Sequence, residues 1–227
     1  MALPLKTLKS TDNLGNNSRC GIQKSWPLKS KVDESLHWDY IQKVNYAVQD
    51  FNSCVANKEP LNRENVVFAI TLVDWIGAAV RNVLECYRED AVSGFFYTQQ
   101  YELDSMDKYF RAVRSFVNAH PLETSRHKDY GLDGAYVCID LRTNSGPFDK
   151  LDANQFMLSP IGLKRVSSLR EADAVLFAYS KNDGGTFFHY IGLDLADIRH
   201  VASLYINELY ELDAYLGGLR KSDFHTR

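Results

Sequence analysis

The stretch from Val66 to Leu84 constrains the fold most, because its apolar residues point in nearly every direction around a helix. They are Val66, Val67, Ile70, Val73, Ile76, Val80, Val83 and Leu84. A helix that is apolar on all sides must be surrounded by other elements, so this stretch predicts the central helix of a bundle. The nearly apolar run 66–80 contains Thr71 and Asp74. It is also shorter than the roughly 20 residues that cross a bilayer, so we expect a soluble protein without a membrane partner.

Three further segments show the one-sided apolar periodicity of amphipathic helices. They cover residues 33–57, 104–120 and 198–216. Asn62 is a plausible N-cap for the central helix. Pro121 disfavours helical geometry in the residue before it, which predicts that the helix over 104–120 ends at His120. The chain is therefore predicted to contain a four-helix bundle.

Between the third and fourth helices the pattern changes to that of β-strands. The segments concerned are AYVCIDLR (135–142), AVLFAYS (174–180) and TFFHYIGL (186–193). The stretch between the first two is predicted to be a loop with a short element near QFML. We therefore predict an α+β fold, mainly α, in which a small antiparallel β-rich insertion at about 130–193 separates the third helix from the fourth.

Charge and cysteine content bound the remaining organisation. Residues 1–32 carry six basic side chains against only Asp12, which predicts a flexible basic N-terminal arm. A single domain is expected over 33–217, with a C-terminal tail over 218–227. The formal charge of -3 gives no bulk attraction to nucleic acid, although a local basic patch stays open. The four cysteines lack metal-site or redox spacing, and the start lacks a secretory leader, so a cytoplasmic location is expected.

The segment KYFRAVRSFVNAHP, residues 108–121, holds the strongest candidate for chemistry. At about 100° per residue, His120 falls within about 40° of the core-facing direction of its helix, and Arg114 lies about 80° to the flank. Asn118 lies one turn beyond Arg114 on that flank. The partial negative charge at a helix C-terminus favours protonated imidazole, so His120 is suited to donate a proton.

The run from Arg114 to His120 resembles the R-x4-6-H motif of the HEPN superfamily, including the polar Ser115 directly after the arginine. The resemblance implies a HEPN-like four-helix bundle. It also implies a metal-independent RNA endonuclease without a cofactor, acting as a homodimer in a toxin or anti-phage defence setting, with a neutralising antitoxin or regulatory protein as a partner. Arg114 would then bind the scissile phosphate, and His120 would transfer a proton during attack by the ribose 2′-OH. Ser115 and Asn118 would orient this pair, and Asp74 is our own addition to the pocket.

Other interpretations stay open. Arg114 and His120 also suit an ion-paired arginine and a hydrogen-bonded core histidine in a non-catalytic bundle that binds a protein or an RNA. A second match to the motif, Arg220 to His225, lies in the predicted tail. His120, His127 and Asp133 are potential zinc or manganese ligands for a hydrolase, but their spacing fits no strong motif, and no metal is expected.

A few further residues are candidates for contact rather than for catalysis. The loop residues Arg126, His127, Lys128 and Tyr130 are candidates for RNA contact. On the predicted strands, His189 and Asp140 are interpreted as members of cross-strand pairs and Cys138 as a small apolar side chain. The aromatic residues Phe187, Phe188 and Tyr190 could stack on bases, although packing explains them as well.

Overall fold

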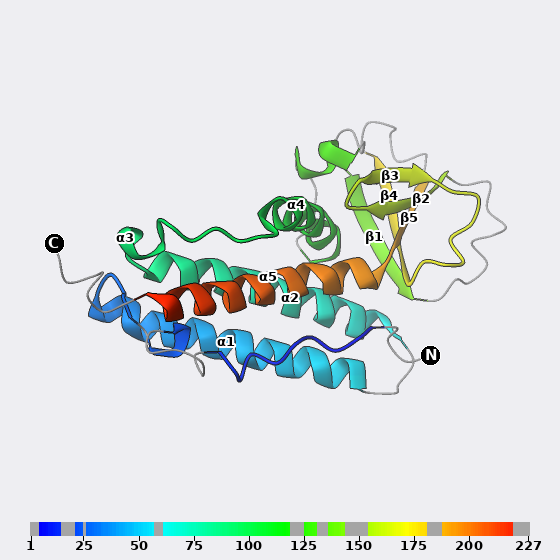
Figure 1. Cartoon of the computed structure of the whole chain (residues 1–227). Coiled ribbons are helices and arrows are strands. Elements are labelled where there is room, and N and C mark those ends of the chain that lie inside the picture. The colour runs from blue at the N-terminus through cyan, green and yellow to red at the C-terminus, as the bar shows by residue number, and fades with distance from the viewer. Residues whose placement is uncertain are drawn as a thin grey trace. The chain divides into compact units, whose positions relative to one another are not determined.

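In the computed structural model, the described residues form mainly helices and one sheet. The prediction of an α+β fold that is mainly α is therefore confirmed. The structure describes residues 5–14, 21–24, 26–56, 61–118, 125–130, 136–143, 154–180 and 188–219. The α-helices are α1 (Lys31–Ala56), α2 (Arg63–Cys86), α3 (Glu89–Val92), α4 (Gln100–Val117) and α5 (Leu195–Gly218) (Figure 1). The short 3-10 helices are η1 (Ile22–Lys24) and η2 (Ser125–Tyr130). The strands are β1 (Tyr136–Thr143), β2 (Asn154–Ser159), β3 (Gly162–Arg165), β4 (Ala174–Ser180) and β5 (Phe188–Leu193).

The four predicted helices correspond to α1, α2, α4 and α5, and the short α3 is an addition. The predicted cap of α2 is confirmed, since the Asn62 side chain accepts a hydrogen bond from the Asn65 amide at 2.8 Å. The helix predicted over 104–120 begins earlier, at Gln100, and its last helical residue is Val117. Residues 119–124 lie outside the described residues.

The chain divides into two compact units, where the sequence predicted one domain. Unit 1 comprises residues 1–6, 54–71 and 104–201, and unit 2 comprises residues 7–53, 72–103 and 202–227. One boundary falls after residue 6, and the other four fall inside α1, α2, α4 and α5. Unit 1 therefore contains the whole sheet and most of α4, and unit 2 contains most of α1, α2 and α5.

The sheet of unit 1 has the strand order β1-β4-β5-β2-β3. Its pairs are antiparallel except for β2 with β5, which run parallel. The prediction of an antiparallel sheet is therefore wrong at this pair. The segment near QFML is a full strand, β2. Between β2 and β5 the chain passes through β3, the crossover 166–173 and β4, so the two strands are not joined by a hairpin and can pair in parallel.

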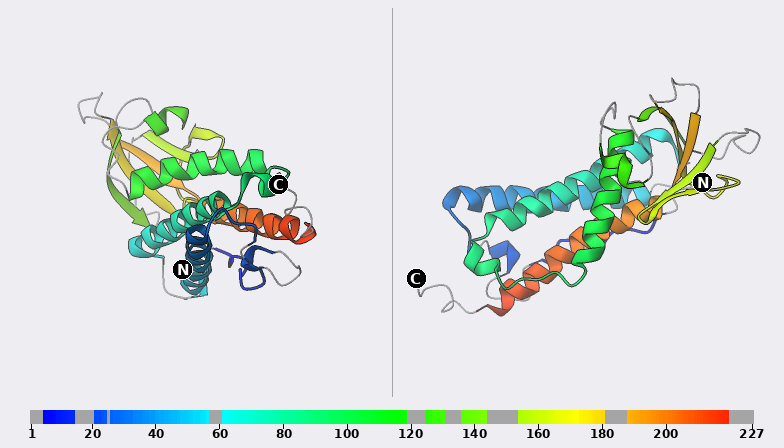
Figure 2. Two further views of the ribbon diagram at one scale, coloured as in Figure 1. Left: turned by 90° about the vertical axis from the view of Figure 1, so that its left-hand side faces the viewer. Right: turned by 90° about the horizontal axis from the view of Figure 1, so that it is seen from above.

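The two faces of the sheet differ in what covers them. The cross-strand row Leu141, Leu176 and Ile191 is buried, and residues 104–117 of α4 lie along that side of the sheet (Figures 1 and 2). On the opposite face, Leu169 and Ala172 of the crossover pack on Val175 and Phe177. Gly192 lies beneath this crossover, and a Cβ there would come within 2.9 Å of Met157, Leu169 and Ala172 side chains. Close packing of the crossover on the sheet thus requires glycine at this position.

The described residues of the segment predicted as a flexible arm are packed. Leu8, Leu14 and Ile22 are buried within unit 2. The Leu8 amide donates to the Asn52 side chain at 2.6 Å, and the Ile22 amide donates to the Asp213 carboxylate at 2.7 Å. This corrects the prediction, because apolar burial and backbone hydrogen bonds hold the segment against the helices. Of the predicted tail, residues 220–227 lie outside the described residues.

The helix α2 is the one element of the described chain that is long and apolar enough to pass as a membrane span by composition. More than half of its most apolar window, 56%, is buried inside the protein. Burial of this kind is what a central core helix requires, in agreement with the all-round apolar pattern of its sequence.

Candidate functional site

The candidate site is built on the last turn of α4, whose buried stripe is the predicted one. Met106, Phe110 and Val113 are all buried in unit 1. Arg114 follows on the flank of this stripe and is half-buried, and Ser115 is buried. A cationic side chain in the last helical turn is favoured by the partial negative charge of the helix C-terminus.

Asn118 fixes the end of α4 to α2. Its backbone amide donates to the Arg114 carbonyl at 2.8 Å, which completes the last turn. Its side-chain amide donates to the Thr71 hydroxyl at 3.1 Å, and that hydroxyl donates to the Val67 carbonyl at 2.9 Å. The polar flank of α4 is thus held at a defined place beside α2, with Arg114 one turn before the anchoring residue.

The structure places the other predicted site residues in different surroundings. His120 and Asp133 lie outside the described residues, as do the side chains of Arg126 and His127. Lys128 is exposed. Tyr130 is buried, with its ring edge-on to Tyr109 at a centroid distance of 6.3 Å, so it does not present a surface for base stacking.

Asp74 is half-buried on α2 and belongs to unit 2, whereas Arg114 belongs to unit 1. Among the described residues, no group of three histidine, cysteine or acidic side chains is arranged to hold a metal ion.

A buried tyrosine pair that sequence reasoning missed lies on α4 and η2. Burial raises the pKa of Tyr130 to about 12, with Asp129 and Asp107 adding to the effect. Burial also raises the pKa of Tyr109 well above its usual range, and Asp197 and Asp194 act in the same direction. Both phenols are therefore neutral. The Tyr109 hydroxyl is fully buried and has no hydrogen-bond partner within the described part of the chain.

Replacing Tyr109 with phenylalanine is expected to raise the free energy of unfolding by about 1 kcal/mol, because the change removes a buried donor that gains no hydrogen bond. Urea unfolding of the variant and the wild type measures this difference. Tyr130→Phe serves as the ring-matched comparison. A loss of stability in Tyr109→Phe would show that its hydroxyl has a partner after all.

The candidate residues on the strands take part in packing and in ion pairs. Burial raises the pKa of Cys138 to about 11, which agrees with its interpretation as a small apolar side chain rather than a nucleophile. The His189 ring lies against Phe156 at a centroid distance of 5.8 Å. Asp140 interacts with Arg63 and Arg142, two residues that sequence reasoning did not select. The signal for Arg142 was available, because residues two apart on a strand share a face.

Comparison of the chain with protein-family models, with curated proteins and with solved structures finds no match. The HEPN resemblance therefore rests on the motif from Arg114 to His120 and on the order of the helices.

Proposed function

We propose that the protein is a metal-independent RNA endonuclease of HEPN type, with a HEPN-like bundle formed by its four long helices. The observation that supports this most is the position of Arg114. It lies half-buried in the last turn of α4, one turn before the anchored Asn118. A guanidinium at this position can bind a phosphate and stabilise charge that develops on it.

The proposed chemistry needs two groups. Arg114 binds the scissile phosphate and neutralises the extra negative charge of the transition state. His120 transfers the proton, either taking it from the attacking 2′-OH or giving it to the leaving 5′ oxygen. The new bond joins the 2′ oxygen to phosphorus, and the bond from phosphorus to the 5′ oxygen breaks. The products are a 2′,3′-cyclic phosphate and a 5′-OH. The two side chains carry out these steps without a metal or cofactor in the proposed mechanism.

The proposal extends to the biological setting. A cytoplasmic toxin or anti-phage defence effector, acting as a homodimer and restrained by an antitoxin or regulatory protein, is the setting that the HEPN resemblance implies. In this setting Ser115 and Asn118 orient the catalytic pair.

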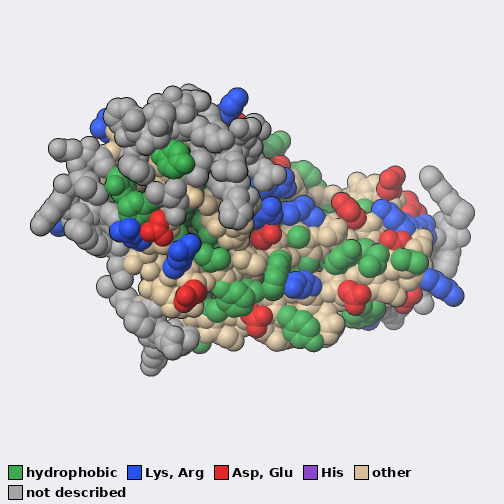
Figure 3. Space-filling view, turned by 180° about the vertical axis from the view of Figure 1, so that it is seen from behind, with side chains coloured by type: hydrophobic (Ala, Val, Ile, Leu, Met, Phe, Trp, Pro, Cys, Tyr) green, Lys and Arg blue, Asp and Glu red, His purple; other side chains and the backbone are tan. Residues whose placement is uncertain are grey.

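A second candidate is a non-catalytic protein that binds a protein partner, and exposed side chains of unit 2 favour it. Val32, Leu36 and Tyr46 of α1 and Trp75 of α2 are all at least 39% exposed. Large hydrophobic side chains of this kind lie among charged ones along the helices (Figure 3). Lys43 lies over the Trp75 ring at 3.3 Å. Clustered exposed aromatic and aliphatic residues are typical of protein-binding surfaces.

Incubation of purified protein with total cellular RNA in excess EDTA separates these candidates. We expect the wild type to cleave RNA under these conditions and the Arg114→Ala/His120→Ala double variant to leave it intact. Cleavage that requires an added divalent ion would contradict the metal-independent mechanism. Intact RNA with both proteins would favour the binding protein instead.

A further inference from the structure

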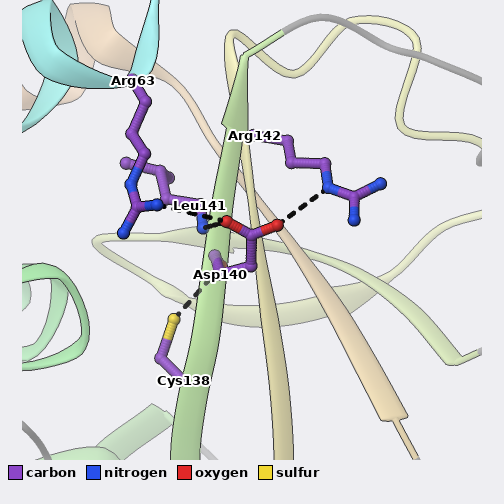
Figure 4. A network of polar contacts seen from close by, with 5 residues as sticks. All are labelled: Arg63, Cys138, Asp140, Leu141 and Arg142. Carbon is purple, nitrogen blue, oxygen red and sulfur yellow. Dashed lines mark hydrogen bonds and ion pairs between the residues drawn. The ribbon is translucent and has the colours of Figure 1, made fainter.

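A cluster of charged residues lies at the edge of the sheet, where β1 meets the start of α2. The Asp140 carboxylate accepts a hydrogen bond from the Arg142 Nε at 2.9 Å and another from the Leu141 amide at 2.9 Å. The Arg63 guanidinium lies 3.7 Å from the same carboxylate on its other oxygen (Figure 4). We refer to these three side chains as the Arg63–Asp140–Arg142 cluster.

The backbone explains why the three residues meet. The pairing of β1 with β4 shifts register between Cys138 and Asp140, so the strand carries a bulge next to the acid. Bulges re-aim side chains and occur often beside functional sites. At the end of β1, the Thr143 hydroxyl donates to the Leu61 carbonyl at 3.2 Å, and this contact holds the strand against the start of α2.

The cluster has two positive charges and one negative charge, and both arginine side chains are exposed to solvent. Their side chains are 65% exposed for Arg63 and 59% exposed for Arg142, against 31% for Asp140. The Arg142 guanidinium also lies over the Phe177 ring, 4.5 Å from its centroid. The Phe177 ring and the Asp140 carboxylate, which is bound through Nε, together fix the plane of the Arg142 guanidinium. Both of its Nη groups point away from Asp140 (Figure 4). A guanidinium presented in this way can bind an anion with two parallel hydrogen bonds.

Aromatic side chains continue from the cluster across the same face of the sheet. The strand register places Asp140, Phe177, Tyr190 and Gln155 in one cross-strand row. The Phe177 and Tyr190 rings meet edge to face at a centroid distance of 4.7 Å, and Tyr190 is half-buried. The neighbouring row runs from Arg142 to the exposed Lys164 at the opposite edge. Leu169 and Ala172 of the crossover pack on Phe177 on this face, and Tyr190 lies partly buried beside them. The face therefore exposes its cationic edges and part of Tyr190.

We propose that this face binds single-stranded RNA. The Arg63–Asp140–Arg142 cluster contacts the phosphodiester backbone, and a base contacts the exposed part of the Tyr190 ring. Arginine forks suit phosphate, and proteins bind unpaired bases through aromatic side chains that lie close to cationic ones. An acidic protein segment would use the arginines but would not need an aromatic ring beside them. Asp140 is a positioning residue, because it acts through Arg142.

The choice of RNA rests on the proposed function. Within unit 1, helix α2 connects the Arg63–Asp140–Arg142 cluster with the end of α4. Arg63 and Thr71 are both on α2, and Thr71 holds the Asn118 side chain at the end of α4. Arg63 and Thr71 are eight residues apart, which separates them by about 12 Å along the helix axis and by roughly 80° around it. A strand bound at the cluster therefore lies within a few nucleotides of the α4 terminus.

Fluorescence anisotropy with the full-length protein tests the proposal. The probe is a short single-stranded RNA with a 2′-O-methyl group at every position, which cannot undergo 2′-OH attack. We expect Arg63→Gln/Arg142→Gln to weaken binding by about tenfold at moderate salt and to lower the slope of log affinity against log salt by about 1.4. Thermal unfolding checks that the variant is folded.

The matched control is Arg88→Gln. Arg88 also pairs with an aspartate two residues away, Asp90, but on α3 in unit 2. Unchanged affinity in the double variant, or an equal loss in Arg88→Gln, would overturn the proposal. So would competition by polyglutamate as strong as that by unlabelled RNA, which would identify an acidic protein segment as the ligand. Because the probe cannot be cleaved, these results are independent of whether the protein is a ribonuclease.

Discussion

Replacing Arg114 with alanine is expected to lower the rate of RNA cleavage by about 100- to 1,000-fold, the effect of removing one preorganised donor from a charged transition state. The loss should appear under single-turnover conditions with saturating enzyme, where substrate binding no longer limits the rate. Arg114→Lys keeps the charge but not the planar fork, so it should recover only part of the rate.

Arg111 provides the matched control on the same helix. It lies one turn earlier, is partly exposed, and pairs with Asp107 at 2.6 Å. Arg111→Ala should cleave RNA at the wild-type rate, because this residue has no part in the proposed chemistry. Equal losses in Arg111→Ala and Arg114→Ala would assign the effect to general charge or to α4 stability and would contradict a specific role for Arg114.

The second large effect is a loss of folding stability at low pH, and it depends on His37. This residue is completely buried in unit 2. Its Nε2 lies 2.9 Å from the Tyr87 hydroxyl, which also lies 3.4 Å from the Ile22 carbonyl. Burial lowers the pKa of His37 to about 4, from the ordinary value of about 6.5. The folded protein therefore holds this imidazole neutral at pH values at which the unfolded chain would protonate it.

The direction of the pH dependence follows from these two pKa values. Stability from the neutral His37 is complete above the unfolded pKa and is lost as pH falls from about 6.5 towards 4. The loss over this window is about 3 kcal/mol. We expect urea unfolding to show it in the wild type and in Tyr87→Phe, which both keep the histidine, but not in His37→Phe. Parallel pH profiles for the wild type and His37→Phe would contradict this assignment.

The helices could be predicted because their signals are local. The all-round apolar pattern of α2 and the capping residue Asn62 are properties of neighbouring residues, and tertiary packing preserved both. His37 escaped attention for a related reason. It shares a helical face with Ile41, Val44 and Val48, so its burial was predictable, but a single histidine carries no further pattern.

Long-range pairing explains what the sequence could not predict. The parallel partner of β2 depends on where the crossover 166–173 leads the chain, and no periodicity encodes that path. The buried residues of the predicted arm, such as Leu8, Leu14 and Ile22, have irregular spacing, and their partners lie far along the chain, as Asp213 does for Ile22. The Arg63–Asp140–Arg142 cluster likewise joins residues about 80 positions apart.

The chemistry of the cleaved ends tests the central claim most directly. Wild-type protein in EDTA, given a short RNA and the same RNA with 2′-O-methyl groups, should cleave only the first. It should leave a 2′,3′-cyclic phosphate and a 5′-OH, which mass spectrometry of the fragments identifies. Cleavage of both RNAs, or fragments with a 5′-phosphate, would contradict attack by the 2′-OH and with it the roles proposed for Arg114 and His120.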